Sequence, residues 1–251
     1  MIGIVGGVGP HAGVDLMKKV FDQTLAGSDQ EHVDALLFSQ PSGIMDRTDY
    51  LLGKVEENPG KALAGILLRL EEAGATVAGI PCNTAHAGLI FNLILDLLNE
   101  AGSRIKLLHM IRETILFMDV LAPGVKRVGV LSTTGTYRAG IYRMALSANG
   151  YEPVLPPFDM QETLIHPAIY DPEYGIKSLP DRIHPQAVEH LDRGFAWLES
   201  RGAEAVILGC TEIPLAFPSA RVRGMLCIDP TVALARALLR ESFPEKLKPL
   251  N

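Results

Sequence analysis

The chain has 251 residues, of which 47% are hydrophobic and 21% are charged, and its net charge is −6. This composition is typical of a soluble globular protein, and the length is sufficient to bury a substantial core. The acidic balance excludes a basic stripe of the kind that binds nucleic acid, so we expect no nucleic-acid partner.

Short apolar runs alternate with longer segments of helical pattern along the whole chain. The predicted strands cover residues 2–5, 35–39, 77–80, 106–109, 127–131, 152–154, 205–208 and 225–228. The predicted helices cover residues 9–25, 59–73, 85–101, 111–120, 135–149, 184–201 and 230–243. This alternation predicts an α/β fold of mostly parallel sheets with helices on both faces.

Two segments of the chain resemble each other. Residues 74–84 and 202–211 both begin with Gly-Ala, continue as a buried-strand pattern and reach a cysteine that threonine closely follows. The cysteines, Cys82 and Cys210, are 128 residues apart, and the strands that begin at Ile2 and Val128 are 126 residues apart. Any two parallel strands share an apolar pattern, but the matched cysteine and threonine indicate two homologous lobes.

The repeat predicts how the chain divides. We expect residues 1–110 and 211–251 to form a first α/β lobe, on the Cys82 side, and residues 111–210 to form a second, on the Cys210 side. A pseudo-twofold axis would relate the lobes, with the active site in the cleft between them. Ligands of parallel sheets bind at the carboxyl ends of the strands, where both cysteines are predicted to lie.

Three further features near strand ends leave alternatives open. The turn that contains Gly9 lacks the GxGxxG spacing, so we favour close approach to a small anion over dinucleotide binding. Arg47 is a solvated surface charge, a partner for Asp46 or Asp49, or a bidentate ligand for a carboxylate. His86 either orients the Cys82 thiol or caps the following helix.

The compartment and the metal content follow from simpler counts. No apolar run reaches the roughly 18 to 20 residues that span a bilayer, and residues 1–5 lack the basic segment of a secretory signal. Three cysteines without a disulfide spacing are typical of a reduced, cytoplasmic protein, and Cys227 is expected to be a buried structural thiol. Because the apolar runs are too short to span a bilayer, we expect no membrane partner. The scattered histidines predict no metal site.

Five short motifs extend over nearly the whole chain. They are Gly6-Gly7-Val8-Gly9-Pro10, Asp46-Arg47-Thr48, Pro81-Cys82-Asn83-Thr84-Ala85-His86, Leu131-Ser132-Thr133-Thr134-Gly135-Thr136 and Gly209-Cys210-Thr211-Glu212. Together they resemble the aspartate/glutamate racemase family, and aspartate racemases most closely. The resemblance implies an isomerase that needs no cofactor, pyridoxal phosphate included, acts on a small acidic amino acid, and forms a homodimer.

The chemistry of racemisation explains why a pair of thiols is needed. To invert Cα, a base must remove the proton from one face while an acid delivers one to the other. By hypothesis, Cys82 and Cys210 are the thiolate and the thiol that exchange these roles. The resemblance further implies substrate-binding positions at Arg47, Asn83, Thr84, Thr133, Lys177 and Thr211, with Gly9, His86 and Glu212 in support.

Other readings of the same residues remain open. Arg47 and Lys177 together suit a short dicarboxylate, which favours aspartate over glutamate, but Val8 and His11 depart from the family's usual turn and leave the substrate open. The alternatives are another cysteine-dependent enzyme of this superfold, such as a maleate isomerase, a malonate-type decarboxylase or a hydantoin racemase, or a non-catalytic dicarboxylate-binding protein. A disulfide between the two cysteines is disfavoured, since it would leave no room for a substrate carbon.

Overall fold

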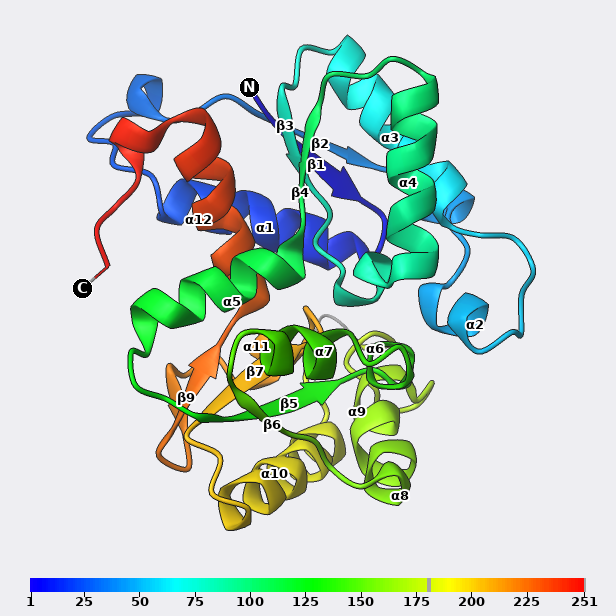
Figure 1. Ribbon diagram of the computed structural model, residues 1–251, viewed down its shortest axis with the longest axis vertical. Helices are drawn as coiled ribbons and strands as arrows, with labels where there is room; N and C mark the ends of the chain where they lie inside the picture. Colours follow the sequence, from blue (N-terminus) through cyan, green and yellow to red (C-terminus); the bar gives the residue numbers. More distant parts are fainter. Residues whose placement is uncertain (180–181, 251) are drawn as a thin grey trace. The chain divides into compact units, whose positions relative to one another are not determined.

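The computed structural model describes residues 1–179 and 182–250 of the chain (Figure 1). It contains two compact units, Met1–Glu113 with Thr231–Asn251 and Thr114–Pro230. Each unit has its own sheet with helices on both faces, so the predicted α/β class is confirmed. None of the helices within the described residues is long and apolar enough to cross a membrane.

The first unit is built on a fully parallel sheet of four strands. Their order is β2-β1-β3-β4, with bounds Ala35–Ser39, Ile2–Gly6, Val77–Gly79 and Lys106–Leu108. The two central strands, β1 and β3, are buried along their whole length. Central parallel strands are covered on both faces, which is why their sequences are continuous apolar runs rather than alternating ones.

Helices cover both faces of this first sheet (Figure 1). On one face, α3 (Gly60–Glu72) and α4 (Gly88–Glu100) pack together over β1 and β3. On the other face, α1 (Pro10–Asp22) and α12 (Pro230–Ser242) place Leu16, Leu234 and Leu238 against Ile2 and Ile4. The shorter elements are η1 (Asp29–Glu31), η2 (Pro41–Gly43), α2 (Arg47–Leu51), η3 (Asn83–His86) and η5 (Pro244–Lys246).

The second unit is built on a five-stranded sheet of order β6-β5-β7-β9-β8. The strands are β5 (Arg127–Ser132), β6 (Glu152–Val154), β7 (Ala205–Gly209), β8 (Arg221–Val222) and β9 (Met225–Ile228). All pairs are parallel except β8 with β9, which form a hairpin. Its two-residue turn has positive φ angles at Arg223 and Gly224, the geometry that matches the natural twist of paired strands.

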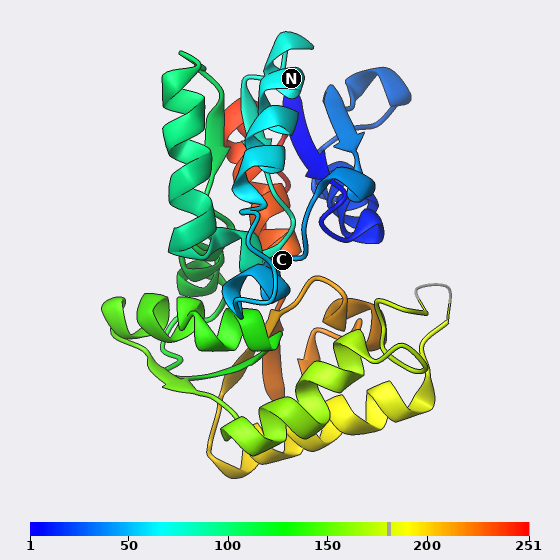
Figure 2. The same cartoon turned by 90° about the vertical axis from the view of Figure 1, so that its right-hand side faces the viewer.

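The helices of the second unit differ from the prediction in three places, one of them the short helix at residues 213–216. They are α5 (Met110–Leu121), α6 (Thr134–Arg138), α7 (Ile141–Ala148), α8 (Phe158–Met160), the π turn η4 (Gln161–Ile165), α9 (His166–Tyr170), α10 (Pro185–Ser200) and α11 (Ile213–Ala216). The predicted helix 135–149 is divided at Gly140, whose φ of 64° is left-handed. The helical run 158–170 was not predicted; α9 and α10 lie side by side (Figure 2).

The chain returns to the first unit later than the sequence indicated. The predicted division placed residues 211–230 in the first lobe, whereas in the structure they lie in the second unit. The physical reason is that β9 pairs with β7, aligning Cys227 with Val206, so that the return comes after Ile228 at Pro230. The first crossing lies within α5, between Glu113 and Thr114, close to the predicted position.

Candidate active site

In the first unit, the candidate residues lie in loops at the carboxyl edge of the sheet. The chain leaves β3 through Ile80 and Pro81, and Cys82 then opens the 3-10 turn η3 with an extended backbone. Cys82 is 8% exposed, and the two residues after it, Asn83 and Thr84, are buried as well. The turn is held by hydrogen bonds from the Cys82 amide to the Ile80 carbonyl, 2.8 Å, and from the Ala85 amide to the Cys82 carbonyl, 3.2 Å.

His86 supports the backbone of this turn. Its Nδ1 lies 2.9 Å from the Cys82 carbonyl oxygen, and since a carbonyl can only accept, Nδ1 carries the hydrogen. Its ring stacks on Phe91 and lies 4.8 Å from the His109 ring. Burial, with a smaller contribution from His109, lowers the pKa of His86 to about 3, so the imidazole is neutral. The helix-cap alternative is not observed, because α4 has no side-chain cap.

Arg47 is the first residue of α2, and its side chain is only 9% exposed. Its guanidinium donates to the Met45 carbonyl at 3.2 Å and lies 3.9 Å from Asp46, which caps α2 through the Asp49 amide. Arg47 is therefore not a fully solvated charge, because its side chain is buried and lies near Asp46. Because α2 packs against η3, the fold brings the Arg47 helix alongside the turn that follows Cys82.

Gly9 ends the loop after β1, the strand adjacent to β3. Its φ of 102° and the φ of 91° at Gly7 are conformations that favour glycine. A Cβ at Gly7 would approach the Gln40 backbone to 2.8 Å, so the turn is closed tightly against the loop after β2. The Gly-Gly-x-Gly turn thus positions backbone at the same edge of the sheet as Cys82.

In the second unit, Cys210 directly follows β7 and is 5% exposed. Its Sγ lies 2.9 Å from Oε2 of Glu212, and the Thr211 hydroxyl lies 3.1 Å from the same oxygen. Nζ of Lys177 lies 2.5 Å from the other oxygen, Oε1, and 5.6 Å from the centre of the Tyr170 ring. Four of the polar residues named by the sequence and the resemblance, Cys210, Thr211, Glu212 and Lys177, therefore form one connected cluster.

The charges in this cluster determine where its protons reside. Burial and the negative charge of Glu212 raise the pKa of the Cys210 thiol well above its usual value, although Lys177 acts in the opposite direction. Burial alone would raise the pKa of Glu212, but the Lys177 ammonium and three hydrogen bonds lower it. Burial alone would likewise lower the pKa of Lys177, but Glu212 raises it above its usual value. The cluster is therefore a thiol, a carboxylate and an ammonium.

Lys177 reaches the cluster because its loop folds back on α9. The Ile176 amide donates to the Ala168 carbonyl at 3.0 Å, and the Lys177 amide donates to the Ile169 carbonyl at 3.1 Å. Gly175 makes this close return possible, since a Cβ there would lie 2.5 Å from the Asp171 nitrogen. The loop is thus fixed by backbone hydrogen bonds, which positions a lysine from a distant part of the sequence beside Glu212.

Thr133 occupies the neighbouring strand end of the same unit. It caps α6, its hydroxyl accepting from the Thr136 amide, and it directly follows β5, whose last residue pairs with Gly209 of β7. Sequence reasoning missed the residue that supports this loop, Gln161, which is fully buried and donates to the Ser132 carbonyl at 2.9 Å. Its only signal in the sequence is a glutamine in a segment whose pattern predicts neither helix nor strand.

Within each unit, the predicted site residues collect at strand ends or in the loops packed against them. Unit 1 holds Gly9, Arg47, Cys82, Asn83, Thr84 and His86; unit 2 holds Thr133, Lys177, Cys210, Thr211 and Glu212. All three cysteines are free thiols. The described residues contain no group of three His, Cys, Asp or Glu side chains that could hold a metal ion.

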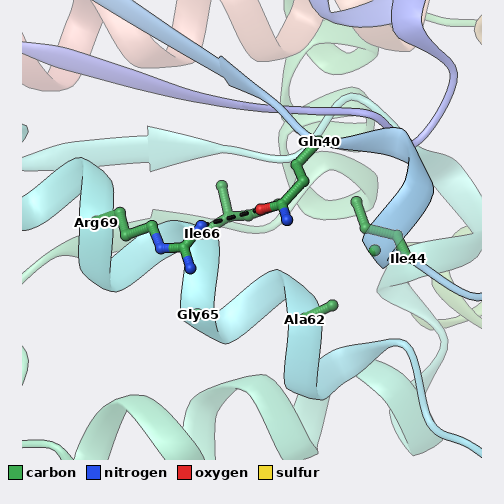
Figure 3. A pocket seen from close by; sticks show the side chains of 7 residues that line it. Gln40, Ile44, Ala62, Gly65, Ile66 and Arg69 are labelled. Atoms are coloured by element: carbon green, nitrogen blue, oxygen red, sulfur yellow. Dashed lines mark hydrogen bonds between the residues drawn. The ribbon is translucent and has the colours of Figure 1, made fainter.

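A hollow beside α3 contains none of these residues (Figure 3). It has a volume of about 170 Å³ and is lined by Gln40, Gly43, Ile44, Ala62, Gly65, Ile66 and Arg69. Arg69 donates to Gln40 at 2.9 Å across it and lies over the Phe38 ring. The lining offers no nucleophile and no carboxylate or imidazole, so it is not a candidate for acid–base chemistry.

Comparison with known proteins identifies the family of the chain. Residues 5–238 match the family model described as Asp/Glu/Hydantoin racemase. The chain belongs to this racemase family. An aspartate racemase of Picrophilus torridus is 30% identical, with a TM-score of 0.78 over 98% of this chain and 95% of that one. An aspartate racemase homologue of Pyrococcus horikoshii is 26% identical, with a TM-score of 0.68 over 96% and 97% of the two chains.

A further relative is named for a broad substrate specificity. The broad specificity amino-acid racemase RacX of Bacillus subtilis is 31% identical over 156 residues. That match spans 61% of this chain and 63% of RacX, so it covers less than two thirds of either protein. The similarity supports membership of the racemase family, and the choice of substrate rests on the residues of the site.

Proposed function

We propose that the protein is a cofactor-independent amino-acid racemase that interconverts the L- and D-forms of aspartate or glutamate. The observation that carries the proposal is the presence of one buried thiol after β3 and another after β7, in a chain of the racemase family. Each thiol is accompanied by hydrogen-bonding side chains at its own strand end. The resemblance to aspartate racemases over nearly the whole chain supports the acidic substrate.

The proposed chemistry is a proton exchange at Cα between Cys82 and Cys210. A thiolate removes the Cα proton, the electron pair of that bond stays on the substrate as a carbanion, and a thiol delivers a proton to the opposite face. The proposal requires both thiols to reach the same carbon. Because the carbanion delocalises onto the α-carboxylate, we assign the stabilising donors to Asn83, Thr84, Thr133 and Thr211.

Binding of the acidic substrate is assigned to Arg47 and Lys177. Arg47 is buried and directed by its helix, and a guanidinium binds a carboxylate through two parallel hydrogen bonds. Lys177 already neutralises Glu212, which reduces the positive charge that it can offer to a second carboxylate. The second candidate function is therefore a racemase of broad specificity, which accepts amino acids with other side chains. The relative RacX is named for such broad specificity.

We also propose that the racemase is a cytoplasmic homodimer. All three cysteines are free, as expected in a reducing compartment. Exposed apolar side chains on α4 and α7, Leu89 at 70% and Met144 at 61%, are available for burial against a second copy. Light scattering of the purified chain would give the mass of the assembly, and a mass of one chain at micromolar concentration would exclude the dimer.

The racemase proposal is tested by proton NMR in D2O with no added cofactor. L-aspartate, L-glutamate and a panel of neutral and basic amino acids are each incubated with the protein and with its Cys82→Ala and Cys210→Ala variants. Cys227→Ala is the matched control, because it removes the third thiol of the chain, on β9, outside both clusters. We expect loss of the Cα–H signal and, by chiral chromatography of the same samples, growth of the D-isomer, both abolished in the first two variants and retained in the control.

The substrate panel separates the alternatives. Exchange of aspartate or glutamate alone supports the acidic racemase, whereas comparable exchange of several neutral or basic amino acids supports the broad-specificity alternative. No exchange of any amino acid by folded protein with free thiols would refute the racemase proposal. Maleate, malonates and hydantoins would then be the next substrates, and binding of a dicarboxylate without turnover would identify a binding protein.

A further inference from the structure

The duplicated cysteines have different residues two positions further along the chain. Glu212 follows Cys210 at this spacing, whereas Thr84 follows Cys82. In unit 2 the carboxylate folds back, so that its Oε2 lies 2.9 Å from the Cys210 sulfur. A threonine at the equivalent position cannot place a negative charge beside Cys82. The two halves of the repeat therefore give their thiols different electrostatic surroundings.

We propose that Glu212 is a positioning residue that holds the proton of Cys210 in the resting enzyme, so that Cys210 acts as the acid and Cys82 as the base of the first turnover. The inference rests on the proposed racemase function and goes further, because it assigns a distinct starting role to each cysteine. Glu212 acts through the thiol rather than on the substrate.

The contacts of Glu212 explain why the proton stays on sulfur. Lys177 at 2.5 Å and the Thr211 hydroxyl at 3.1 Å both favour the ionised carboxylate, which then accepts the hydrogen of the thiol. The opposite arrangement, a Cys210 thiolate beside a protonated Glu212, would leave the Lys177 ammonium without its ion-pair partner. The Glu212 side chain is only 7% exposed, so water screens this choice weakly.

The first turnover then follows with a balanced transfer of protons. The Cys82 thiolate forms a new S–H bond with the Cα proton, and the electron pair of the C–H bond remains on the substrate. The S–H bond of Cys210 breaks as its proton passes to Cα, and its electron pair remains on sulfur. One thiolate is consumed and one is formed. The new Cys210 thiolate lies beside the Glu212 carboxylate, and this repulsion favours return of a proton to Cys210.

The experiment measures the protonation of Cys210 directly. Cys82 and Cys227 are replaced by serine, which leaves Cys210 as the only thiol, and its alkylation by iodoacetamide is followed by mass spectrometry from pH 6 to pH 10. Only the thiolate reacts, so the rate profile reports the pKa of Cys210. The same chain is compared with Glu212→Gln and with the matched control Glu162→Gln. Glu162 is a carboxylate of the same unit that bonds Thr134 at 2.8 Å.

We expect the rate for the chain with Glu212 to keep rising to pH 10 without a plateau. Glu212→Gln should shift the profile to lower pH by about one to three units, because a like charge is removed. Glu162→Gln should reproduce the profile of the parent chain. Coinciding profiles with and without Glu212 would overturn the inference, whatever the racemase assay gives. If the profile shifts but no amino acid is racemised, the proposed function is refuted, and with it the role of Cys210 as the acid. The effect of Glu212 on the protonation of Cys210 would still be supported.

Circular dichroism shows whether Glu212→Gln folds. If it does not, a second measurement on the unmodified protein tests the proposal. In the unmodified protein, peptide mapping gives a separate alkylation profile for each cysteine, and comparing pH dependence rather than absolute rate removes the effect of accessibility. Because the pKa of Cys210 is raised, its profile should lie at higher pH than that of Cys82. A midpoint for Cys210 equal to or below that for Cys82 would overturn the proposal.

Discussion

Replacing Lys177 by methionine would leave the Glu212 carboxylate buried without its cation. The pair is 2.5 Å apart, and its side chains are 20% and 7% exposed. Removing one partner of a buried ion pair destabilises a protein by about 3–5 kcal/mol, because the remaining charge is uncompensated. Since Lys177 retains some contact with water, we expect a loss near the lower end of that range, about 3 kcal/mol. For a chain of this size, that corresponds to a fall in Tm of about 6–12 °C.

The pH dependence of this loss has a definite sign. In the native protein, the pKa of Glu212 is lowered, so its contribution to stability is present above the unfolded pKa and disappears as the pH falls through the folded one. The pKa of Lys177 is raised, so its contribution is complete below the unfolded pKa and disappears as the pH rises through the folded one. In Lys177→Met, burial raises the pKa of Glu212 instead, and the folded state takes up a proton. The loss of unfolding free energy that Lys177→Met causes should therefore be largest near pH 8 and smaller near pH 5.

Thermal and urea unfolding at pH 8 and pH 5 would measure both effects. Lys54→Met is the matched control, because Lys54 pairs with Asp49 at 3.0 Å while both side chains are largely exposed; its cost should stay below about 1 kcal/mol. Adding Glu212→Leu to Lys177→Met should recover most of the stability, because no buried charge remains. A deficit below about 1 kcal/mol at pH 8, or one that grows on acidification, would refute the argument.

Three further predictions concern single positions. Gly175→Ala should displace the loop that carries Lys177, because the new Cβ would meet the Asp171 backbone at 2.5 Å. We expect the free energy of unfolding, measured in urea, to fall by about 1–3 kcal/mol. An unchanged midpoint would contradict this. Gly65→Ala, within α3 and with no atom inside 4 Å of its Cβ, should instead stabilise by about 0.5–1 kcal/mol in the same assay, and any loss would contradict this. His86 should show no titration by NMR between pH 5 and pH 8, since its pKa is about 3, whereas a midpoint near 6.5 would show it to be solvated.

The sequence predicted the central framework because buried parallel strands have a strong local signal. Each of the eight predicted strands is present within a residue or two of its expected ends. The missing strand, β8, has only two residues and depends on the positive φ angles of the turn at Arg223 and Gly224. The pairing of β9 with β7 is a long-range event, which is why the return to the first unit was expected too early.

The unpredicted helical run 158–170 has a different cause. Pro167 lies inside it and has no N–H, and the preceding Pro156 and Pro157 are typical of a loop. The structure accommodates this segment with the π turn η4 just before α9, held by packing against α10. Tertiary contacts therefore overrode the local signal. The consequence reaches the site, because Gln161 within this turn supports the Ser132 carbonyl beside Thr133.

The candidate site shows the same division between local and long-range information. Cys82 and Cys210 could be predicted from the repeat, since each lies directly after a strand. The resemblance named Lys177 and Glu212, but their pairing could not be predicted from spacing, because it depends on the loop that folds back on α9. His86 was placed beside Cys82, yet its bond to the backbone carbonyl rather than to the thiol required the geometry of the turn.

A repeat gives two thiols the same position in two folds, but it does not give them the same chemistry. Reaction at Cα needs an acid and a base at the same moment, and two identical environments would leave the choice between them undetermined. The neighbours break this symmetry: a neutral imidazole fixes the backbone at Cys82, and an ionised carboxylate bonds the Cys210 sulfur. The backbone determines where the thiols lie, and in the mechanism that we propose one side chain, Glu212, determines which of them begins with its proton. In that mechanism the reaction runs in both directions, and Lys177, 2.5 Å from Glu212, limits the repulsion when Cys210 has given its proton up.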